Sequence, residues 1–134
     1  MLINDYVSGY IDKLIHAFPT IKSIWLFGSR ANKCFNAQSD WDLLVFSDEQ
    51  TFEQIKTAKS HKDDVIDLFV VYNEDSFEEP WPDISKGTKS GKLSGLFSFE
   101  WKKVSESEAT YTGRKDLSGG IVKKETLMAL KVWP

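Results

Sequence analysis

The chain has 134 residues, of which 41% are hydrophobic and 28% are charged. These proportions are typical of one globular domain and argue against a wholly disordered chain. With 17 basic and 20 acidic residues, the formal charge of −3 argues against a general nucleic-acid binder or a binder of anionic membranes.

No run of about 18 apolar residues occurs, so the sequence predicts no membrane span. The first residues carry an early Asp5 and lack the basic-then-apolar pattern of a secretory signal. The single cysteine, Cys34, cannot form an internal disulfide, and we expect it to be a small packing residue. A cytoplasmic location is the simplest expectation.

The first half of the chain alternates helical and strand patterns. Apolar residues at helical spacing from Tyr6 to Phe18 predict a helix, with Asn4 as its N-cap and Pro19 after its end. Three apolar segments then predict strands, separated by a short helix or turn over 30–35 and a helix over 51–62. Those strands are expected at residues 21–27, 41–46 and 65–72. The order predicts helices packed on a sheet.

The pattern after residue 72 is less regular. Residues 86–95 have the composition of a loop, residues 96–105 and 109–112 are expected to be strands, and Gly119-Gly120 is a break. Residues 122–132 are expected to form a last helix with Leu127, Leu130 and Val132 as apolar contacts. We expect one domain over 1–134, with a core at about 1–72 and a strand and loop extension at about 73–134.

The most informative segment begins at the end of the first predicted strand. Gly28 allows close backbone approach to a ligand, Ser29 adds a hydroxyl donor and Arg30 adds a cation. The unpaired N–H groups of a helix start suit phosphate. An ordinary turn is the alternative interpretation of this segment.

Two carboxylates, Asp40 and Asp42, open the second predicted strand. Residues two apart on a strand point to the same face, so these like charges would repel unless a cation lies between them. A divalent ion with oxygen ligands resolves that conflict. The alternative is that Asp40 caps a turn and Asp42 is solvated at the strand end.

A third carboxylate, Asp67, lies within the apolar segment VIDLFVV. Burying an isolated carboxylate is costly, so Asp67 needs a partner. If the third strand lies beside the second, Asp67 can reach the same ion as Asp40 and Asp42. The alternatives are a surface position on an edge strand or a pairing with a lysine.

The combined pattern resembles the nucleotidyltransferase superfamily of the DNA polymerase beta type, and most of all its minimal nucleotidyltransferases. The pattern is Gly28-Ser29, ten intervening residues, Asp40-x-Asp42 followed by Leu-Leu-Val, and Asp67 in a later apolar strand. The resemblance covers about residues 1–72.

The resemblance implies a mixed α/β (α+β) fold, in which helices pack on a mixed central sheet. It also implies a Mg²⁺-dependent enzyme. Two Mg²⁺ ions, for which Mn²⁺ can substitute, would be held by Asp40, Asp42 and Asp67, and Gly28 and Ser29 would hold the phosphates of a nucleoside triphosphate. The reaction would move a nucleoside monophosphate, AMP if the donor is ATP, onto an acceptor hydroxyl and release pyrophosphate. The acceptor is not implied.

One departure from the family pattern concerns the residues after Ser29. Small members often have Gly-Ser-x-Ala-Arg-Gly, whereas this chain has Ala31 followed by Asn32 and Lys33. Arg30 or Lys33 could make the missing phosphate contact. Triphosphate binding could equally be weaker or lost.

The resemblance also allows two functions without the full reaction. Some small relatives are the antitoxin of a pair with a small all-helical protein, and this chain would then be mainly a binding module, with residues 96–101 as a candidate interaction surface. An accessory domain that binds no nucleotide is the third alternative.

Overall fold

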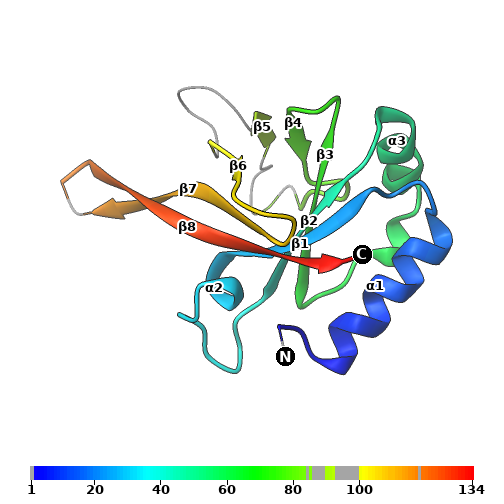
Figure 1. Ribbon diagram of the computed structural model, residues 1–134, viewed down its shortest axis with the longest axis horizontal. Coiled ribbons are helices and arrows are strands. Elements are labelled where there is room, and N and C mark those ends of the chain that lie inside the picture. Colours follow the sequence, from blue (N-terminus) through cyan, green and yellow to red (C-terminus); the bar gives the residue numbers. More distant parts are fainter. Residues whose placement is uncertain (1, 84, 86–89, 93–99, 118) are drawn as a thin grey trace.

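A computed structural model describes residues 2–83, 85, 90–92, 100–117 and 119–134 of the chain (Figure 1). In chain order, the elements are α1 (Asp5–Ala17), β1 (Ser23–Phe27), α2 (Gly28–Ala31), β2 (Trp41–Phe46), α3 (Glu49–Thr57), the 3-10 turn η1 (Lys59–His61), β3 (Ile66–Tyr72), β4 (Ser76–Glu78), β5 (Ser90–Lys92), β6 (Lys102–Lys103), β7 (Glu108–Leu117) and β8 (Ile121–Trp133).

The described strands form one curled mixed sheet in the order β5-β4-β3-β2-β1-β8-β7-β6. Strands β2 and β3 are parallel, and the chain between them includes α3. Strand β1 is antiparallel to both of its neighbours, β2 and β8. The predicted mixed sheet with packed helices is therefore confirmed.

Helices α1 and α3 cover one face of the sheet (Figure 1). The predicted N-cap of α1 is present, because the Asn4 side chain accepts a hydrogen bond of 2.9 Å from the Val7 N–H. Helix α3 begins earlier and ends earlier than predicted, and the Asp48 carboxylate caps it by accepting a bond of 2.7 Å from the Thr51 N–H. The buried side chains of this layer include Val7, Ile11, Leu14, Leu43, Val45, Phe52, Ile55, Leu68 and Val70.

A second apolar cluster lies on the other face, inside the curl of the sheet. Alternation along β2 sends Leu43 and Val45 to the helical face and Leu44 to this inner face. The cluster joins the start of the chain to its end, because its buried members are Trp25, Phe27, Leu44, Phe69, Val71, Phe77, Ala109, Tyr111 and Ala129. Trp101 packs against it, with its ring 5.2 Å from that of Trp25.

The predicted helix over residues 122–132 is wrong, because this segment is the strand β8. It pairs with β1 on one side and with β7 on the other. The side chains of Leu127 and Ala129 contact the inner cluster, whereas Leu130 and Val132 contact the helical layer. Side chains that alternate between two covered faces are typical of a buried strand. A short apolar segment of the sequence does not distinguish such a strand from a helix.

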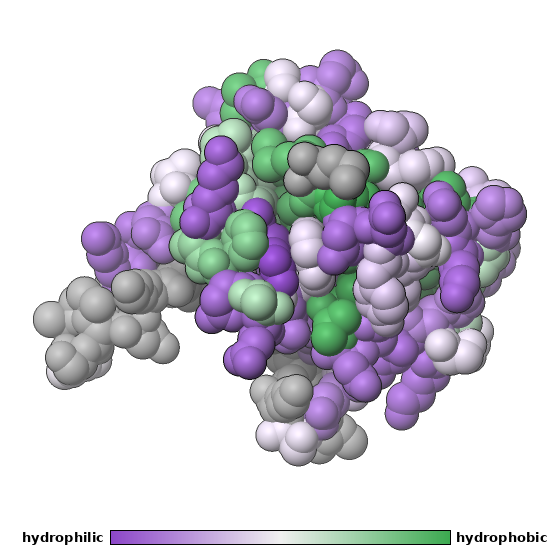
Figure 2. Space-filling view, turned by 90° about the horizontal axis from the view of Figure 1, so that it is seen from below, coloured by the Kyte–Doolittle hydropathy of each residue, from purple (hydrophilic) through white to green (hydrophobic). Residues whose placement is uncertain are grey.

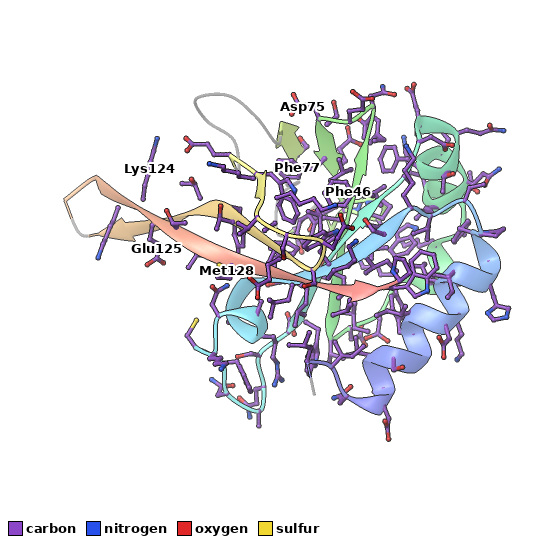
Figure 3. The ribbon with its side chains drawn as sticks, viewed as in Figure 1. Phe46, Asp75, Phe77, Lys124, Glu125 and Met128 are labelled. Carbon is purple, nitrogen blue, oxygen red and sulfur yellow. The ribbon has the colours of Figure 1, made fainter. Side chains whose placement is uncertain are left out.

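Strands β7 and β8 form a long hairpin that projects from the body of the molecule (Figure 1). The predicted break at Gly119 and Gly120 is confirmed as its turn, with φ of 86° and 79°, respectively. Lys124 and Glu125 lie on the projecting part and point to opposite sides of it, whereas Met128 lies nearer to the body (Figure 3).

Three further expectations concern Cys34, residues 96–101 and residues 86–95. Cys34 is exposed, so its prediction as a packing residue is wrong. Of the predicted interaction surface at 96–101, residues 96–99 lie outside the described part, and Trp101 is half-buried in the inner cluster. Much of the predicted loop at 86–95 also lies outside it.

The surface is polar over most of the face seen in Figure 2, with smaller hydrophobic patches between hydrophilic side chains. No helix in the described ranges is long and apolar enough to cross a membrane.

Candidate active site

Gly28 lies where β1 ends and α2 begins, with the Asp42 side chain directly against it. Its φ of 72° is in the left-handed region, which costs a residue with a side chain more than it costs glycine. A Cβ atom at this position would lie 2.0 Å from the Asp42 Oδ2 atom. Glycine is therefore required here by its neighbour Asp42 as well as by the backbone.

The backbone brings two of the three candidate carboxylates side by side. Asp42 on β2 and Asp67 on β3 are direct partners in the parallel register, so both point to the inner face of the sheet. Asp40, two residues before Asp42, lies just before β2 and is exposed, whereas the other two carboxylates are half-buried.

The side chains themselves do not form a ready-made metal cage. Within the described ranges, no three acidic, histidine or cysteine side chains are grouped closely enough to hold an ion. The donor chemistry and the backbone positions of Asp42 and Asp67 fit a divalent cation, since hard cations prefer oxygen ligands. The grouping of all three carboxylates around an ion stays a prediction.

A cavity of about 370 Å³ opens beside β3. Both Asp40 and Asp67 line it, but Asp42 does not, so the cavity adjoins the pair of carboxylates from the β3 side. Its other lining residues are Lys62, Asp63, Asp64, Ile66, Leu68, Glu79, Trp81 and Asp83. The lining is strongly acidic, which favours positively charged groups in this space.

Arg30 is engaged within the protein. Its Nε and Nη2 atoms donate bonds of 3.2 and 2.9 Å to the Ser39 carbonyl oxygen. Its guanidinium lies 4.5 Å from the Phe35 ring centroid and 4.3 Å from that of Trp41. Arg30 therefore holds the loop that leads to Asp40, and these two bonds use two of its five N–H donors.

The other predicted phosphate contacts lie on or near α2. Ser29 is half-buried in its first turn. Lys33 is exposed and has a φ of 57°, which ends the helical course of the backbone. The roles of Ser29 and Lys33 in phosphate binding stay predictions.

Sequence reasoning missed Tyr111. Its hydroxyl oxygen accepts a bond of 2.8 Å from the Gly28 N–H, although 83 residues separate the two in the chain. Burial is the main cause that raises the pKa of Tyr111, and the negative charge of Asp42 raises it further. Tyr111 lies on β7, in the half of the chain that carried no motif, so no sequence signal marked it.

Asn32 has a structural role that its sequence position did not suggest. Its amide donates bonds of 2.8 Å to the Gly28 carbonyl and 3.1 Å to the Met128 carbonyl, and its Oδ1 atom accepts a bond of 2.8 Å from the Met128 N–H. The residue that departs from the family pattern therefore fastens the turn to β8.

Comparisons with known proteins agree with this arrangement. Residues 10–65 match the family model described as "Polymerase beta, Nucleotidyltransferase". That segment includes Gly28, Ser29, Asp40 and Asp42 and ends two residues before Asp67.

The chain is similar to "Protein adenylyltransferase MntA" from Aphanizomenon flos-aquae, with 45% identity over 40 residues. The matched segment is 30% of this chain and 27% of that protein, so about a quarter of the relative is represented. A solved structure from Sulfolobus solfataricus, described as a nucleotidyltransferase, aligns with a TM-score of 0.44 and 15% identity. The alignment covers 65% of this chain and 75% of that one.

The family match falls on the strand, turn and strand that place Gly28 against Asp42. The relative with 45% identity is itself a nucleotidyl-transferring protein by name. Residues 10–65, the segment that carries Gly28 and Asp42, are therefore similar to the nucleotidyltransferases of the polymerase beta type.

Proposed function

We propose that this protein transfers AMP from ATP to an acceptor hydroxyl and releases pyrophosphate. The observation that carries the proposal is the pairing of Asp42 with Asp67 on adjacent parallel strands, beside a glycine turn that no larger residue could form. A carboxylate pair next to a tightly packed backbone turn suits transfer of a phosphoryl-type group.

A divalent ion, Mg²⁺ or Mn²⁺, would be held by Asp42 and Asp67, with Asp40 completing the ligand set. The family resemblance implies two such ions. Bound there, the metal would supply the positive charge that offsets negative charge on the reacting phosphate.

The residues of the turn would hold the nucleotide. Ser29 offers a hydroxyl and a backbone N–H at the start of α2, and the exposed Lys33 offers a mobile cation. Gly28 would contribute the tight turn that orients Ser29. Arg30 would contact phosphate through guanidinium N–H groups that do not bond to the Ser39 carbonyl.

The acceptor would enter by the acidic cavity beside β3. Asp67 lies both in that cavity and next to Asp42, and its carboxylate would accept a proton from an entering hydroxyl. The similar protein from Aphanizomenon flos-aquae is named a protein adenylyltransferase, and this name supports a hydroxyl on a protein as the acceptor. A small all-helical partner protein is a candidate to carry it.

The test is an assay with ATP labelled on its α-phosphate, Mg²⁺ or Mn²⁺, and the candidate partner or cell extract. We expect label on an acceptor and equimolar pyrophosphate, and a loss of at least about 100-fold in Asp42→Asn and Asp67→Asn. Asp12→Asn, on the exposed side of α1, is the matched control and should keep full activity.

Two results would count against the proposal. One is the absence of labelled acceptor and of pyrophosphate with every nucleoside triphosphate and both metals. The other is equal activity of the wild type, Asp42→Asn and Asp67→Asn.

A further inference from the structure

We propose that Tyr111, from the C-terminal hairpin, is a positioning residue that fixes the nucleotide-binding turn by holding the Gly28 N–H. The inference rests on the proposed function, because it concerns the same site. It adds a part of the chain that lies outside the matched family segment and assigns that part a role in nucleotide binding.

The packing of the Tyr111 ring fixes the position of its hydroxyl. The residue is 5% exposed, and its ring packs edge-on against Phe27, with centroids 5.8 Å apart and planes at 85°. Phe27 directly precedes Gly28 in the chain, so the same contact aligns the ring with the turn. A buried, packed ring gives its hydroxyl little freedom to leave.

The hydroxyl oxygen receives hydrogen bonds from the turn. The Gly28 N–H donates at 2.8 Å and the Asn32 Nδ2 atom lies at 3.4 Å. The oxygen therefore joins Gly28, the first residue of α2, to Asn32, which directly follows the helix. The Gly28 N–H is therefore already committed. Phosphate contacts fall to Ser29, whose orientation depends on the Gly28 backbone.

A second tie supports the same role for the hairpin. Asn32 bonds to both the N–H and the carbonyl of Met128 on β8, in the manner of a paired strand residue. The turn is thus fastened at its start to β7 through Tyr111 and at its end to β8 through Asn32. The hairpin preorganises the turn, and preorganisation lowers the cost of binding a ligand.

The experiment compares Tyr111→Phe with the wild type and with Tyr72→Phe as the matched control. Tyr72 is a half-buried tyrosine of the same sheet, whose hydroxyl bonds to Glu78 at 3.0 Å. We would measure the affinity for ATP with Mg²⁺ by calorimetry, at a temperature at which all three proteins are folded, together with kcat and KM. Loss of one hydrogen bond that orders the turn should weaken ATP binding about tenfold in Tyr111→Phe and leave Tyr72→Phe unchanged.

The outcomes separate this inference from the proposed function. Equal or tighter ATP binding by Tyr111→Phe overturns the inference, even if the wild type transfers AMP. Weaker binding by Tyr111→Phe supports the inference, even if the wild type transfers nothing and the proposed function fails. A wild type that binds no ATP overturns both. A merely structural role would lower the melting temperature of Tyr111→Phe without changing its ATP affinity, and that result also overturns the inference.

Discussion

The first 72 residues and the C-terminal hairpin form the candidate site in different ways. Residues 1–72 supply the carboxylates and the glycine turn, and their elements follow from local patterns with side-chain caps at Asn4 and Asp48. The hairpin supplies no motif, yet it pairs with β1 and holds the turn through Tyr111. Residues that supply chemistry can therefore be recognised from local sequence motifs. Residues that hold them in place are recognised only from tertiary contacts.

The largest effect is expected at the point where the two regions meet. In Gly28→Ala, the new Cβ would clash with Asp42 Oδ2, and the φ of 72° would be strained, so we expect a loss of about 3 kcal/mol in the free energy of unfolding. Denaturant unfolding measures it.

Gly9→Ala is the matched control for Gly28→Ala, because a Cβ at this α1 position has nothing within 4 Å. The control should be stabilised by about 0.5–1 kcal/mol, the difference in helix propensity. If the two variants have equal stability, the close approach of Gly28 to Asp42 is not a constraint on the fold.

A smaller effect tests whether the hairpin depends on the turn. Asn32→Ala removes the two bonds to Met128 and the bond to the Gly28 carbonyl, and these partly buried backbone groups lose their partners. We expect a loss of about 1–3 kcal/mol in the free energy of unfolding. Asn36→Ala, in the exposed loop that follows, should stay within about 0.5 kcal/mol of the wild type. Equal losses in the two variants would contradict a specific fastening at Asn32.

A pH experiment tests the Asp48 cap of α3, a local feature of residues 1–72. Hydrogen bonds from Thr51 lower the pKa of Asp48 below its ordinary value of 3.8. A lowered folded-state pKa means that the carboxylate stabilises the protein fully above the unfolded pKa and loses this contribution as pH falls through the folded pKa. The wild type should therefore lose stability relative to Asp48→Asn as the pH decreases below about 4. Parallel stability curves for the two proteins down to pH 2 would refute this.

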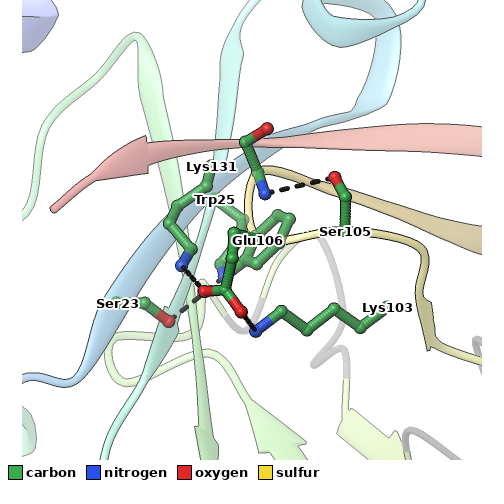
Figure 4. A network of polar contacts seen from close by, with 7 residues as sticks. Ser23, Trp25, Lys103, Ser105, Glu106 and Lys131 are labelled. Carbon is green, nitrogen blue, oxygen red and sulfur yellow. Dashed lines mark hydrogen bonds and ion pairs between the residues drawn. The ribbon is translucent and has the colours of Figure 1, made fainter.

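The smallest effect is expected for a surface ion-pair network next to the hairpin. Glu106 lies 3.4 Å from Lys103 and 3.7 Å from Lys131 at the β6–β7 turn (Figure 4), and its side chain is 90% exposed. Exposed ion pairs contribute little, so Glu106→Gln should cost about 0.5 kcal/mol or less, and 1 M NaCl should reduce that difference. A loss well above 1 kcal/mol would show that this turn contributes more to the hairpin than ion pairs explain.

Local sequence patterns were enough to predict most of the helices and strands of residues 1–72. A stripe at helical spacing predicted α1, and apolar segments predicted β1, β2 and β3. The spacing of Gly28, Asp42 and Asp67 indicated a resemblance to the superfamily whose family model matches residues 10–65. These signals are local because one face of each helix, or both faces of a buried strand, must be apolar whatever the remaining fold is.

The strand conformation of β8 and the contacts of the C-terminal hairpin with the turn depend on the tertiary structure. Leu127 and Leu130 have helical spacing, but pairing of β8 with β1 and β7 satisfies its backbone in an extended form. The contacts of Tyr111 with Gly28 and of Asn32 with Met128 join positions 83 and 96 residues apart. A hydrogen bond between such distant residues leaves no periodic trace in the chain, because it depends on strand order and register rather than on neighbouring side chains.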